Sequence, residues 1–452
     1  MEHEVVVIGA GIGGLTAAAV LAKHGLNVCL LERQSYAGGC AANVEHAGYQ
    51  FEPTHGLYCG WEPEGIFDRL FAELAVTPPR AHLLSTPYVV RLPGGPDVPR
   101  ITQREEIDAA LAAAFPECAD RAIAFYRDLM KASPNGPRPN AHLQSCSIRF
   151  RSFIDTQLQA LAQCSGATCE QHILLSALDP QRSFWEIEGG ALSLVDALLN
   201  SFRKSGGKLR LSSPVLRLAF GPDGSPVGVD LLNGERVFAS RAIVSNLTIW
   251  DTYGKLIGPA RTPRDVSTTL KSMSAFGSYQ MFLTIKESAA SALPAARMLI
   301  VPDLPGHESV PPEETRLSLY RSQRNAVKTS ATEYPVVVSA HTNAEDWFSF
   351  HEDHSAFEER DRSMLEKTWA RLHSALPELG AEVDLIETAT PQTFYESSRR
   401  RFGMIGRPTP AATFLPASPF PSFLMVGDTA AGPFGLDGVA ESASRAVRHL
   451  IQ

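Results

Sequence analysis

The chain has 452 residues, which is enough for about three domain-sized units and a large core. Hydrophobic residues make up 44% and charged residues 20%, as in an ordinary globular protein. Acidic residues outnumber Lys and Arg by 49 to 41, which argues against a nucleic-acid partner. The seven cysteines form no C-x-x-C pair, so we expect no disulfide framework, no metal site and a cytoplasmic location.

Residues 5–22 are almost all apolar and are long enough to span a membrane. However, several glycines interrupt the run, and the residues before it are acidic where an export signal is basic. The pattern instead predicts a strand over residues 5–8, a tight glycine turn, a helix over 15–24 and a second strand over 27–32. We therefore expect no transmembrane segment.

The glycine turn has the pattern G-x-G-x-x-G, formed by Gly9, Gly11 and Gly14, with Ile12 and Gly13 inside it. The first glycine permits a tight turn, the second lets a pyrophosphate approach the backbone, and the third lets helix and strand pack closely. The N–H groups and the dipole at the start of the following helix attract phosphate charge. The turn therefore predicts a dinucleotide site in a Rossmann-like fold.

The residues after the second strand indicate which dinucleotide binds. Glu32 lies 23 residues after the first glycine, where a carboxylate accepts hydrogen bonds from the adenosine ribose. The stretch from Glu32 to Cys40 resembles the E-R-x-x-x-x-G-G signature of FAD enzymes of the amine oxidase and phytoene desaturase superfamily. The resemblance implies that Arg33, Gly38, Gly39 and Cys40 lie beside FAD. A covalent flavin link through Cys40 is conceivable, but we expect non-covalent FAD because most buried cysteines act as small hydrophobes.

Residues 48–56 resemble the next segment of that superfamily, G-x-x-F-D-x-G-x, with Glu52 where Asp is usual. The resemblance implies that this loop runs close to the flavin. His55 is a candidate acid or base there, because histidine titrates near neutral pH. Tyr58 is a second candidate. A purely structural role is an equal alternative for His55, and packing is the alternative for Tyr58.

Residues 86–185 read as a mostly helical insertion, because helical patterns alternate with Pro- and Gly-rich stretches. After it, a Gly-Gly loop, a helix and a strand over residues 208–220 again resemble the superfamily. The resemblance implies that the backbone of Val215 meets the adenine. A hairpin with an Asn-Gly turn and a buried strand follow, and this strand leads to Asn246, which we place at the cofactor.

Residues 266–385 read as a second insertion with both strands and helices, and the final segment returns to the cofactor. A buried strand ends in Gly-Asp, and a glycine-rich run then opens the last helix, as in the superfamily's closing motif. The resemblance implies that Asp428 contacts the ribityl chain and that the helix start faces the flavin pyrimidine. The cofactor residues of this motif are Gly427, Asp428, Gly435, Leu436, Gly438 and Val439. Shortly before it, Arg401 belongs to an Arg-Arg-Arg run that either clamps a substrate anion or is a solvated charge cluster.

These observations predict an α/β fold: a discontinuous Rossmann-like FAD-binding domain of the glutathione-reductase type, joined to a mixed α+β substrate domain. The FAD domain takes residues 1–85, 186–265 and 386–452, and the substrate or cap domain takes 86–185 and 266–385. Only one dinucleotide fingerprint is present, so we expect the substrate to engage FAD directly.

The sequences of the closing motif and of the Gly-Gly loop with its helix are most similar to the phytoene desaturase, carotenoid isomerase and retinol saturase branch. That resemblance implies an enzyme that adds, removes or relocates hydrogen on a C–C or C=C substrate at flavin N5. The alternatives are an amine oxidase-type enzyme that oxidises a C–N bond, and a flavin-binding protein without turnover. Because the first insertion is polar, we expect a small or polar substrate, free or carrier-tethered, and at most peripheral membrane contact.

Overall fold

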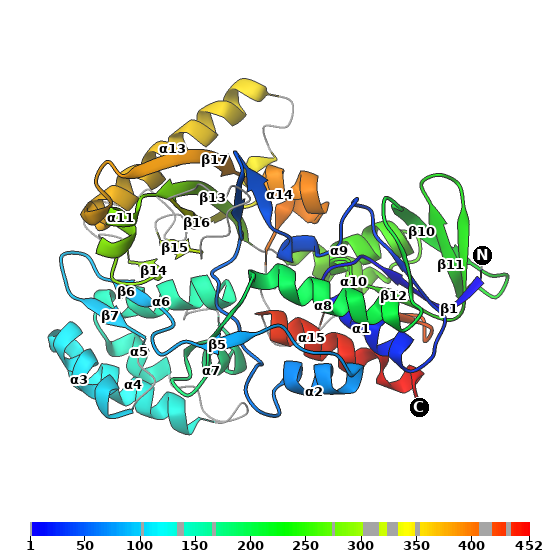
Figure 1. The fold of residues 1–452 in the computed structure, drawn as a ribbon, viewed down its shortest axis with the longest axis horizontal. Coiled ribbons are helices and arrows are strands. Elements are labelled where there is room, and N and C mark those ends of the chain that lie inside the picture. Colours follow the sequence, from blue (N-terminus) through cyan, green and yellow to red (C-terminus); the bar gives the residue numbers. More distant parts are fainter. Residues whose placement is uncertain are drawn as a thin grey trace.

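The computed structural model describes residues 2–100, 104–132, 140–164, 169–273, 276–301, 316–322, 333–348, 353–405, 418–430 and 435–452. Two seven-stranded sheets form the centres of the two halves of the molecule, at the right and the left of Figure 1. The first sheet has the order β10-β11-β12-β1-β2-β9, and β18 pairs with β12. Its strands are β1 (Glu2–Ile8), β2 (Val28–Leu31), β9 (Lys208–Arg210), β10 (Val215–Phe220), β11 (Pro226–Leu231), β12 (Arg236–Ser245) and β18 (Phe423–Met425).

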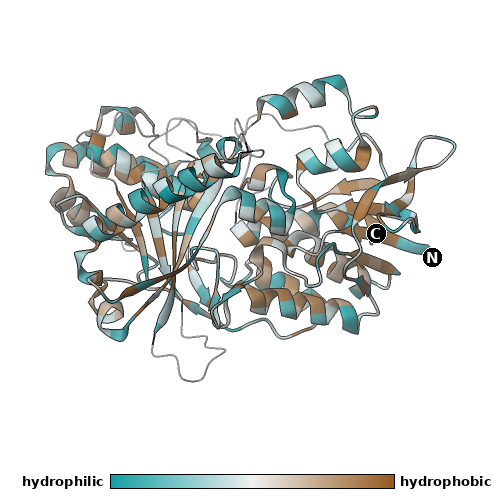
Figure 2. Ribbon diagram, turned by 90° about the horizontal axis from the view of Figure 1, so that it is seen from above, coloured by the Kyte–Doolittle hydropathy of each residue, from teal (hydrophilic) through white to brown (hydrophobic). Residues whose placement is uncertain are grey.

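The centre of the first sheet is parallel and is covered on both faces. β1 pairs in parallel with both β2 and β12, and β18 runs parallel to the end of β12. Strands that are buried on both faces favour continuous apolar runs over alternating ones, and these strands are mostly brown in Figure 2. Helices α1 (Ile12–Lys23), α2 (Ile66–Leu74), α8 (Gly190–Lys204) and α15 (Gly435–Val447) share one core cluster on this sheet.

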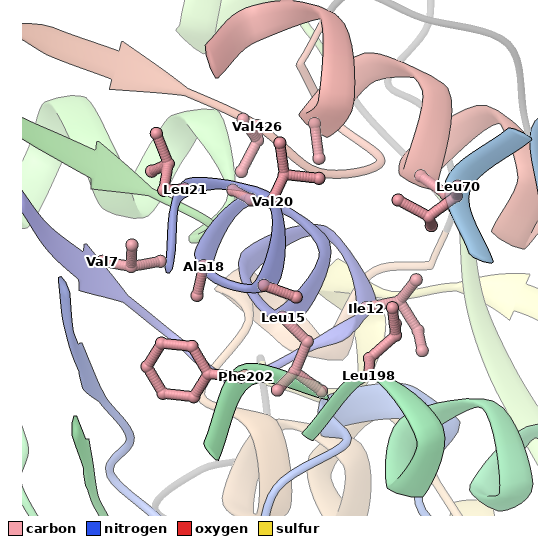
Figure 3. Packing of buried hydrophobic residues seen from close by; sticks show 14 of the residues in the cluster. Val7, Ile12, Leu15, Ala18, Val20, Leu21, Leu70, Leu198, Phe202 and Val426 are labelled. Atoms are coloured by element: carbon pink, nitrogen blue, oxygen red, sulfur yellow. The ribbon is translucent and has the colours of Figure 1, made fainter. Parts of the chain in front are cut away.

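Helix α1 explains the apolar run at the start of the chain. Every residue from Ile12 to Ala22 is buried. Figure 3 shows its side chains against Leu70 of α2, Leu198 and Phe202 of α8, and Val426. The apolar residues of α1 therefore pack against other parts of the protein on several sides of the helix. Among the described residues, no helix is both long and apolar enough to cross a membrane.

The second sheet has the order β17-β13-β16-β15-β14-β6-β7. Its strands are β6 (Val89–Arg91), β7 (Asp97–Pro99), β13 (Phe276–Ile285), β14 (Arg297–Ile300), β15 (Leu317–Arg321), β16 (Tyr334–Asn343) and β17 (Val383–Ala389). The described residues also form two small antiparallel pairs: β3 (Val44–His46) with β4 (Tyr49–Phe51) in a hairpin, and β5 (Ala81–Leu83) with β8 (Trp185–Ile187) from a distant segment. β17 crosses the boundary at residues 385–386 that the sequence suggests, and the division into two domains stays a prediction.

Helices cover the second sheet on both faces (Figure 1). One face packs with α11 (Glu287–Ala292) and α13 (His354–Ala375) through an apolar cluster. The helical insertion lies on the other side and consists of α3 (Arg104–Ala114), α4 (Ala119–Lys131), α5 (Asn140–Ser145), α6 (Ile148–Ala162) and α7 (Gln171–Leu178). The described residues also form α9 (Ile249–Asp251), which continues as a π-helix over Thr252–Ile257, α10 (Arg264–Ser272) and α14 (Pro391–Ser398).

Two sequence expectations about local structure differ from the fold. The single strand expected over 208–220 is two strands, β9 and β10, which lie at opposite edges of the first sheet. The chain turns between them at Ser212, with φ 49°, and Pro214 follows. Conversely, the second hairpin strand and the buried strand after it are one ten-residue strand, β12. Its first half pairs with β11, and its second half pairs with β18.

Candidate functional site

Three glycines from two distant segments surround the side chain of Asn246 at the end of β12. A Cβ atom added to Gly11 would lie 2.8 Å from Asn246 Nδ2. Cβ atoms added to Gly13 and Gly427 would lie 2.5 and 2.9 Å from Asn246 Oδ1. The N–H of Asn246 donates to the carbonyl of Ile8, which fixes it beside β1. The sequence-predicted residues of the first, middle and last segments therefore meet at one place.

The glycine turn has no room for side chains. A Cβ atom on Gly14 would lie 1.9 Å from the carbonyl oxygen of Gly9, because α1 starts directly against the end of β1. Gly9 has a φ of 92°, a conformation that favours glycine. Gly11 is the N-cap of α1, so the free N–H groups of the first helical turn begin at Ile12. A helix start of this kind binds anionic groups.

The second glycine pair lies beside the first turn. Gly38 donates its N–H to the carbonyl of Ala10 over 2.8 Å. A Cβ atom on Gly39 would lie 3.2 Å from the Cα of Gly11. The two main chains thus run close together, which leaves a surface of backbone with few side chains.

Glu32 holds the turn through its carboxylate. Its Oε2 accepts the N–H of Ala10 over 2.7 Å, and its Oε1 accepts the N–H of Gln34 over 2.8 Å. The Glu32 carbonyl accepts the N–H of Ser213 over 2.7 Å, and Val215 begins β10 two residues later. Glu32 and Val215 are therefore neighbours in space, and each carboxylate oxygen keeps a second lone pair for a ligand.

Arg400 is the arginine that faces the closing motif. Its Nη2 and Nη1 donate to the Asp428 carboxylate over 2.9 and 3.2 Å, and its Nε donates to the carbonyl of Met404. By contrast, the Arg401 guanidinium lies over the Phe402 ring, 5.1 Å from its centroid. The predicted candidate Arg401 therefore makes a local stacking contact, while its neighbour carries the bidentate ion pair.

Two other predicted cofactor residues contact the end of the chain. Arg33 donates to the carbonyl of Ser397 over 2.6 Å, so its guanidinium is held by the end of α14. The Cys40 side chain is exposed and receives a hydrogen bond from Arg400. These contacts join the segment after β2 to the last sixth of the chain.

Helix α15 supplies the last predicted residues. It begins at Gly435, and Leu436, Gly438 and Val439 form its first turns. Val439 reaches the glycine turn, since its Cγ1 would lie 3.2 Å from a Cβ atom on Gly13. The start of α15 therefore lies near the start of α1, and both helix dipoles favour negative charge in this region.

A buried ion pair ties the start of α15 to the helical insertion. Arg182 Nη2 donates to Asp437 Oδ2 over 2.8 Å, and Arg182 Nε donates to Cys59 Sγ over 3.1 Å. Burial raises the pKa of Asp437 above the usual range of a carboxyl group, although the Arg182 charge opposes this shift. No local pattern in the sequence marks this pair, because its members are 255 residues apart.

The loop over residues 52–60 is fixed first by Glu52. Its Oε1 accepts the N–H of Ala191 at the start of α8 over 3.2 Å and the hydroxyl of Thr54 over 3.0 Å. Burial raises the pKa of this carboxyl group. A glutamate at this position thus reaches the N-terminus of α8, which accounts for its presence where the superfamily segment usually has Asp.

The same loop is fixed again from the second sheet. Arg297 of β14 donates to the carbonyl of Gly56 over 2.8 Å and to Glu186 Oε1 over 2.5 Å. Tyr58 exchanges both backbone hydrogen bonds with Trp185, and its hydroxyl lies 3.5 Å from Thr54. Tyr58 is buried in a packed position, and this structural role was one of the two that the sequence left open.

His55 lies between this loop and α6, and a second histidine lies near it. His55 donates to the backbone of Ala160, and burial lowers its pKa to about 4. His341 of β16 is 5% exposed and stacks on Phe276, with ring centroids 5.6 Å apart. Burial lowers the pKa of His341 to about 3, with smaller effects from His55 and Arg316. Both rings are therefore neutral at physiological pH.

The sheet face around His341 is polar. Ser278 pairs with His341, and Gln280 pairs with Ser339 in the adjoining row. Gln280 donates to the carbonyl of Pro53 over 3.5 Å, which places it beside the loop. Within the described residues, Gln280 Oε1 and His341 Nδ1 are buried without a hydrogen-bond partner. The interior between sheet, loop and α6 thus offers neutral polar groups.

Sequence reasoning missed Arg182, Arg297, Arg400 and His341. Arg400 belonged to a visible arginine run, so only its position within the run was missed. His341 had a weaker signal, namely a histidine in an otherwise apolar strand. In the described part of the chain, no three His, Cys, Asp or Glu side chains are grouped as metal ligands.

Comparison with known proteins identifies the family of this chain. The family described as "Flavin containing amine oxidoreductase" matches residues 111–451, and an NAD(P)-binding Rossmann-like domain matches residues 7–74. Chloroplastic prolycopene isomerase of Arabidopsis thaliana is 24% identical over 462 residues, which cover 90% of this chain and 75% of that protein. Human all-trans-retinol 13,14-reductase is 26% identical over 303 residues, which cover 57% of this chain and 49% of that protein.

Solved structures show the same fold. An oxidoreductase from Methanosarcina mazei superposes with a TM-score of 0.73 at 17% identity, covering 98% of this chain and 99% of that one. Putrescine oxidase bound to putrescine superposes with a TM-score of 0.61 at 15% identity, covering 100% and 99%. The glycine-rich main chain of the first turn, with the start of α1 beside it, fits the extended FAD of this family. The chain therefore belongs to the flavin containing amine oxidoreductase family and is an FAD-dependent oxidoreductase.

Proposed function

We propose that this enzyme adds, removes or relocates hydrogen on a C–C or C=C substrate that engages FAD directly. The similarity to prolycopene isomerase carries the proposal, because it extends over 90% of the chain and so includes the second sheet and the helical insertion. The retinol 13,14-reductase similarity points to the same branch. Bound FAD supplies the hydride chemistry, and the protein supplies binding and orientation.

We propose that FAD is held without a covalent bond along the line of backbone described above. The start of α1 would bind the pyrophosphate, since its N–H groups and dipole favour anions. Glu32 would accept hydrogen bonds from the adenosine ribose, and Val215 would meet the adenine. Asp428, oriented by Arg400, would contact the ribityl chain. The start of α15 would stabilise negative charge on the flavin ring.

The neutral polar groups between the second sheet, the loop over residues 52–60 and α6 favour a C–C or C=C reaction over amine oxidation. A protonated amine needs a free carboxylate or an aromatic cage. Three carboxylates beside this interior are already bonded: Glu52 to Ala191, Glu186 to Arg297 and Asp155 to Arg316. Neutral His55 and His341 instead suit an uncharged substrate that carries a hydroxyl or carbonyl oxygen.

Because His55 is neutral, we propose that it orients the substrate by hydrogen bonding and does not act as an acid. A group whose pKa lies near 4 is almost entirely in its neutral form at neutral pH, so almost no imidazolium is present to act as a general acid. The cytoplasmic location and a carrier-tethered form of the substrate stay predictions from the sequence.

Anaerobic assays of the FAD-loaded protein with two substrate panels test the proposal. One panel contains conjugated polyenes with and without a hydroxyl group, and the other contains primary amines. With oxidised FAD we expect a polyene product with two hydrogens fewer or with a moved or isomerised double bond, and with FAD reduced beforehand by dithionite we expect a product with two hydrogens more. Bleaching of the flavin by amines, with every polyene recovered unchanged, would show C–N oxidation and contradict the proposal.

A further inference from the structure

Two cysteines in the helical insertion are in direct contact. Cys164 Sγ donates to Cys169 Sγ over 2.9 Å, and both side chains are buried, at 6% and 3% exposure. Both are free thiols. Cys164 lies two residues after the end of α6, and Cys169 lies two residues before the start of α7. The contact thus joins the end of one helix to the start of the next.

The ends of both helices hold the two cysteines in place. Gln163 adopts a left-handed conformation after α6, and the N–H of Cys164 points back to the carbonyl of Leu158 over 3.5 Å. This arrangement resembles the usual capping of helix C-termini. On the other side, Cys169 Sγ lies 3.5 Å from the carbonyl of Glu170, the N-cap residue of α7. The contact between the two sulfur atoms is therefore held by the end of α6 and the start of α7.

We propose that Cys164 and Cys169 form a redox-active dithiol that a hydroperoxide converts into a disulfide across the α6–α7 corner. A disulfide bond is about 2.05 Å long, so a small side-chain rotation brings the two sulfur atoms within bonding distance. The hydrogen bond to Cys169, together with burial, raises the pKa of Cys164. Because Cys164 donates its S–H hydrogen bond to Cys169, Cys169 is the sulfur that attacks the oxidant.

The reaction proceeds in two balanced steps. The Cys169 thiolate attacks one peroxide oxygen, the O–O bond breaks, and Cys169 sulfenic acid and one water form once the leaving oxygen is protonated. The Cys164 sulfur then displaces the hydroxyl group, so that the S–S bond forms, the S–O bond breaks and a second water leaves. Two thiols lose two electrons, and one hydrogen peroxide becomes two waters.

A disulfide between Cys164 and Cys169 would affect the candidate site through helix α6. Helix α6 carries the Ala160 backbone that binds His55, and it carries Gln159 and Asp155, which bind Arg316. A covalent tie at the end of α6 restricts the helix that supports these contacts. The inference itself rests only on the two cysteines, so it is independent of the substrate that the enzyme uses.

Peroxide treatment of the reduced, FAD-loaded full chain tests the inference. After alkylation with N-ethylmaleimide and proteolysis, we expect a peptide linked through Cys164 and Cys169 that is two hydrogens lighter than the dithiol. Dithiothreitol should restore both thiols. The C118S variant serves as the control, because Cys118 also lies in the insertion and contacts another cysteine, and it should keep the same linked peptide.

The C164S variant checks the order of steps. Without its partner, Cys169 should stop at the sulfenic acid, which dimedone traps. Alkylation of both Cys164 and Cys169 after peroxide treatment of the folded wild-type protein would overturn the inference. A disulfide from either of them to Cys118 or Cys146 would overturn it as well. Since these outcomes are read in the wild-type chain, they hold even when the C164S variant does not fold.

Discussion

At the scale of single residues, two neighbouring arginines have separate roles. Arg400 donates hydrogen bonds from both terminal nitrogens to the Asp428 carboxylate and also contacts Cys40. Arg401 instead stacks on Phe402. We expect R400M to weaken FAD binding about tenfold or more, which corresponds to about 1.4 kcal/mol, because Asp428 loses the group that orients it.

The R401M variant is the matched control for this prediction, since it removes the same side chain one position away. Its dissociation constant for FAD should stay within about twofold of the wild-type value, or about 0.4 kcal/mol. Fluorescence titration of the apoprotein with FAD measures both constants. Equal losses in the two variants would show that the ion pair has no special part in holding the cofactor.

A second residue-scale prediction concerns the pH dependence of stability. His341 has a pKa of about 3 in the folded protein, well below its reference value of 6.5. Between about pH 6.5 and pH 3, His341 binds a proton in the unfolded chain but not in the folded chain. The free energy of unfolding therefore falls as the pH falls. The slope is at most about 1.4 kcal/mol per pH unit for one histidine.

Replacing His341 by Gln should remove this slope. Between pH 6.5 and 5, wild-type protein should lose up to about 2 kcal/mol more of its unfolding free energy than H341Q does. Urea unfolding at several pH values measures the difference. The H82Q variant is the control for the loss of a histidine as such, since His82 lies at the surface beside Glu188. Parallel slopes for wild type and H341Q would contradict the buried neutral state.

At the scale of elements, Arg297 joins the second sheet to the loop over residues 52–60. It is 6% exposed and holds both the Gly56 carbonyl and the Glu186 carboxylate. Breaking a buried ion pair by removing one partner is strongly destabilising, so R297M should lower the free energy of unfolding by about 3 kcal/mol. Urea unfolding measures this loss.

R217M provides the comparison, because Arg217 forms an ion pair with Asp230 at the surface, where the Arg217 side chain is 65% exposed. Its effect should stay within about 0.5 kcal/mol. A loss of that small size for R297M would mean that the loop does not depend on this anchor.

Elements with strong local patterns could be predicted from the sequence, and contacts between distant elements could not. The strand, glycine turn and helix at the N-terminus appear as β1 and α1, since a continuous apolar run and glycine spacing are local signals. The break between β9 and β10 was missed because apolar residues continue on both sides of Pro214. The choice of Arg400 over Arg401 depends on the chain direction after α14, where Arg399 has a φ of 55°. Patterns in sequence do not specify such a turn.

Across the two halves of the chain, the proposed FAD site is assembled from segments that are far apart in the sequence. Gly11 and Gly13 come from the first turn, Asn246 from the middle, and Gly427 and Val439 from the end. Each segment alone offers only a few contacts. A ligand that touches all of them therefore stabilises the assembled fold over any partly unfolded form.

This assembly predicts how the protein responds to flavins. FAD should raise the free energy of unfolding of the apoprotein by about 2.7 kcal/mol when its free concentration is one hundred times the dissociation constant. FMN lacks the adenosine half, so it cannot reach Glu32 and the helix start of α1 while it also contacts Asp428. At the same concentration, FMN should give a much smaller shift. Thermal unfolding of the apoprotein across a range of FAD and FMN concentrations measures both effects. Equal shifts for the two flavins would place the bound molecule at the α15 end alone and contradict a site that extends from the first glycine turn to the last helix.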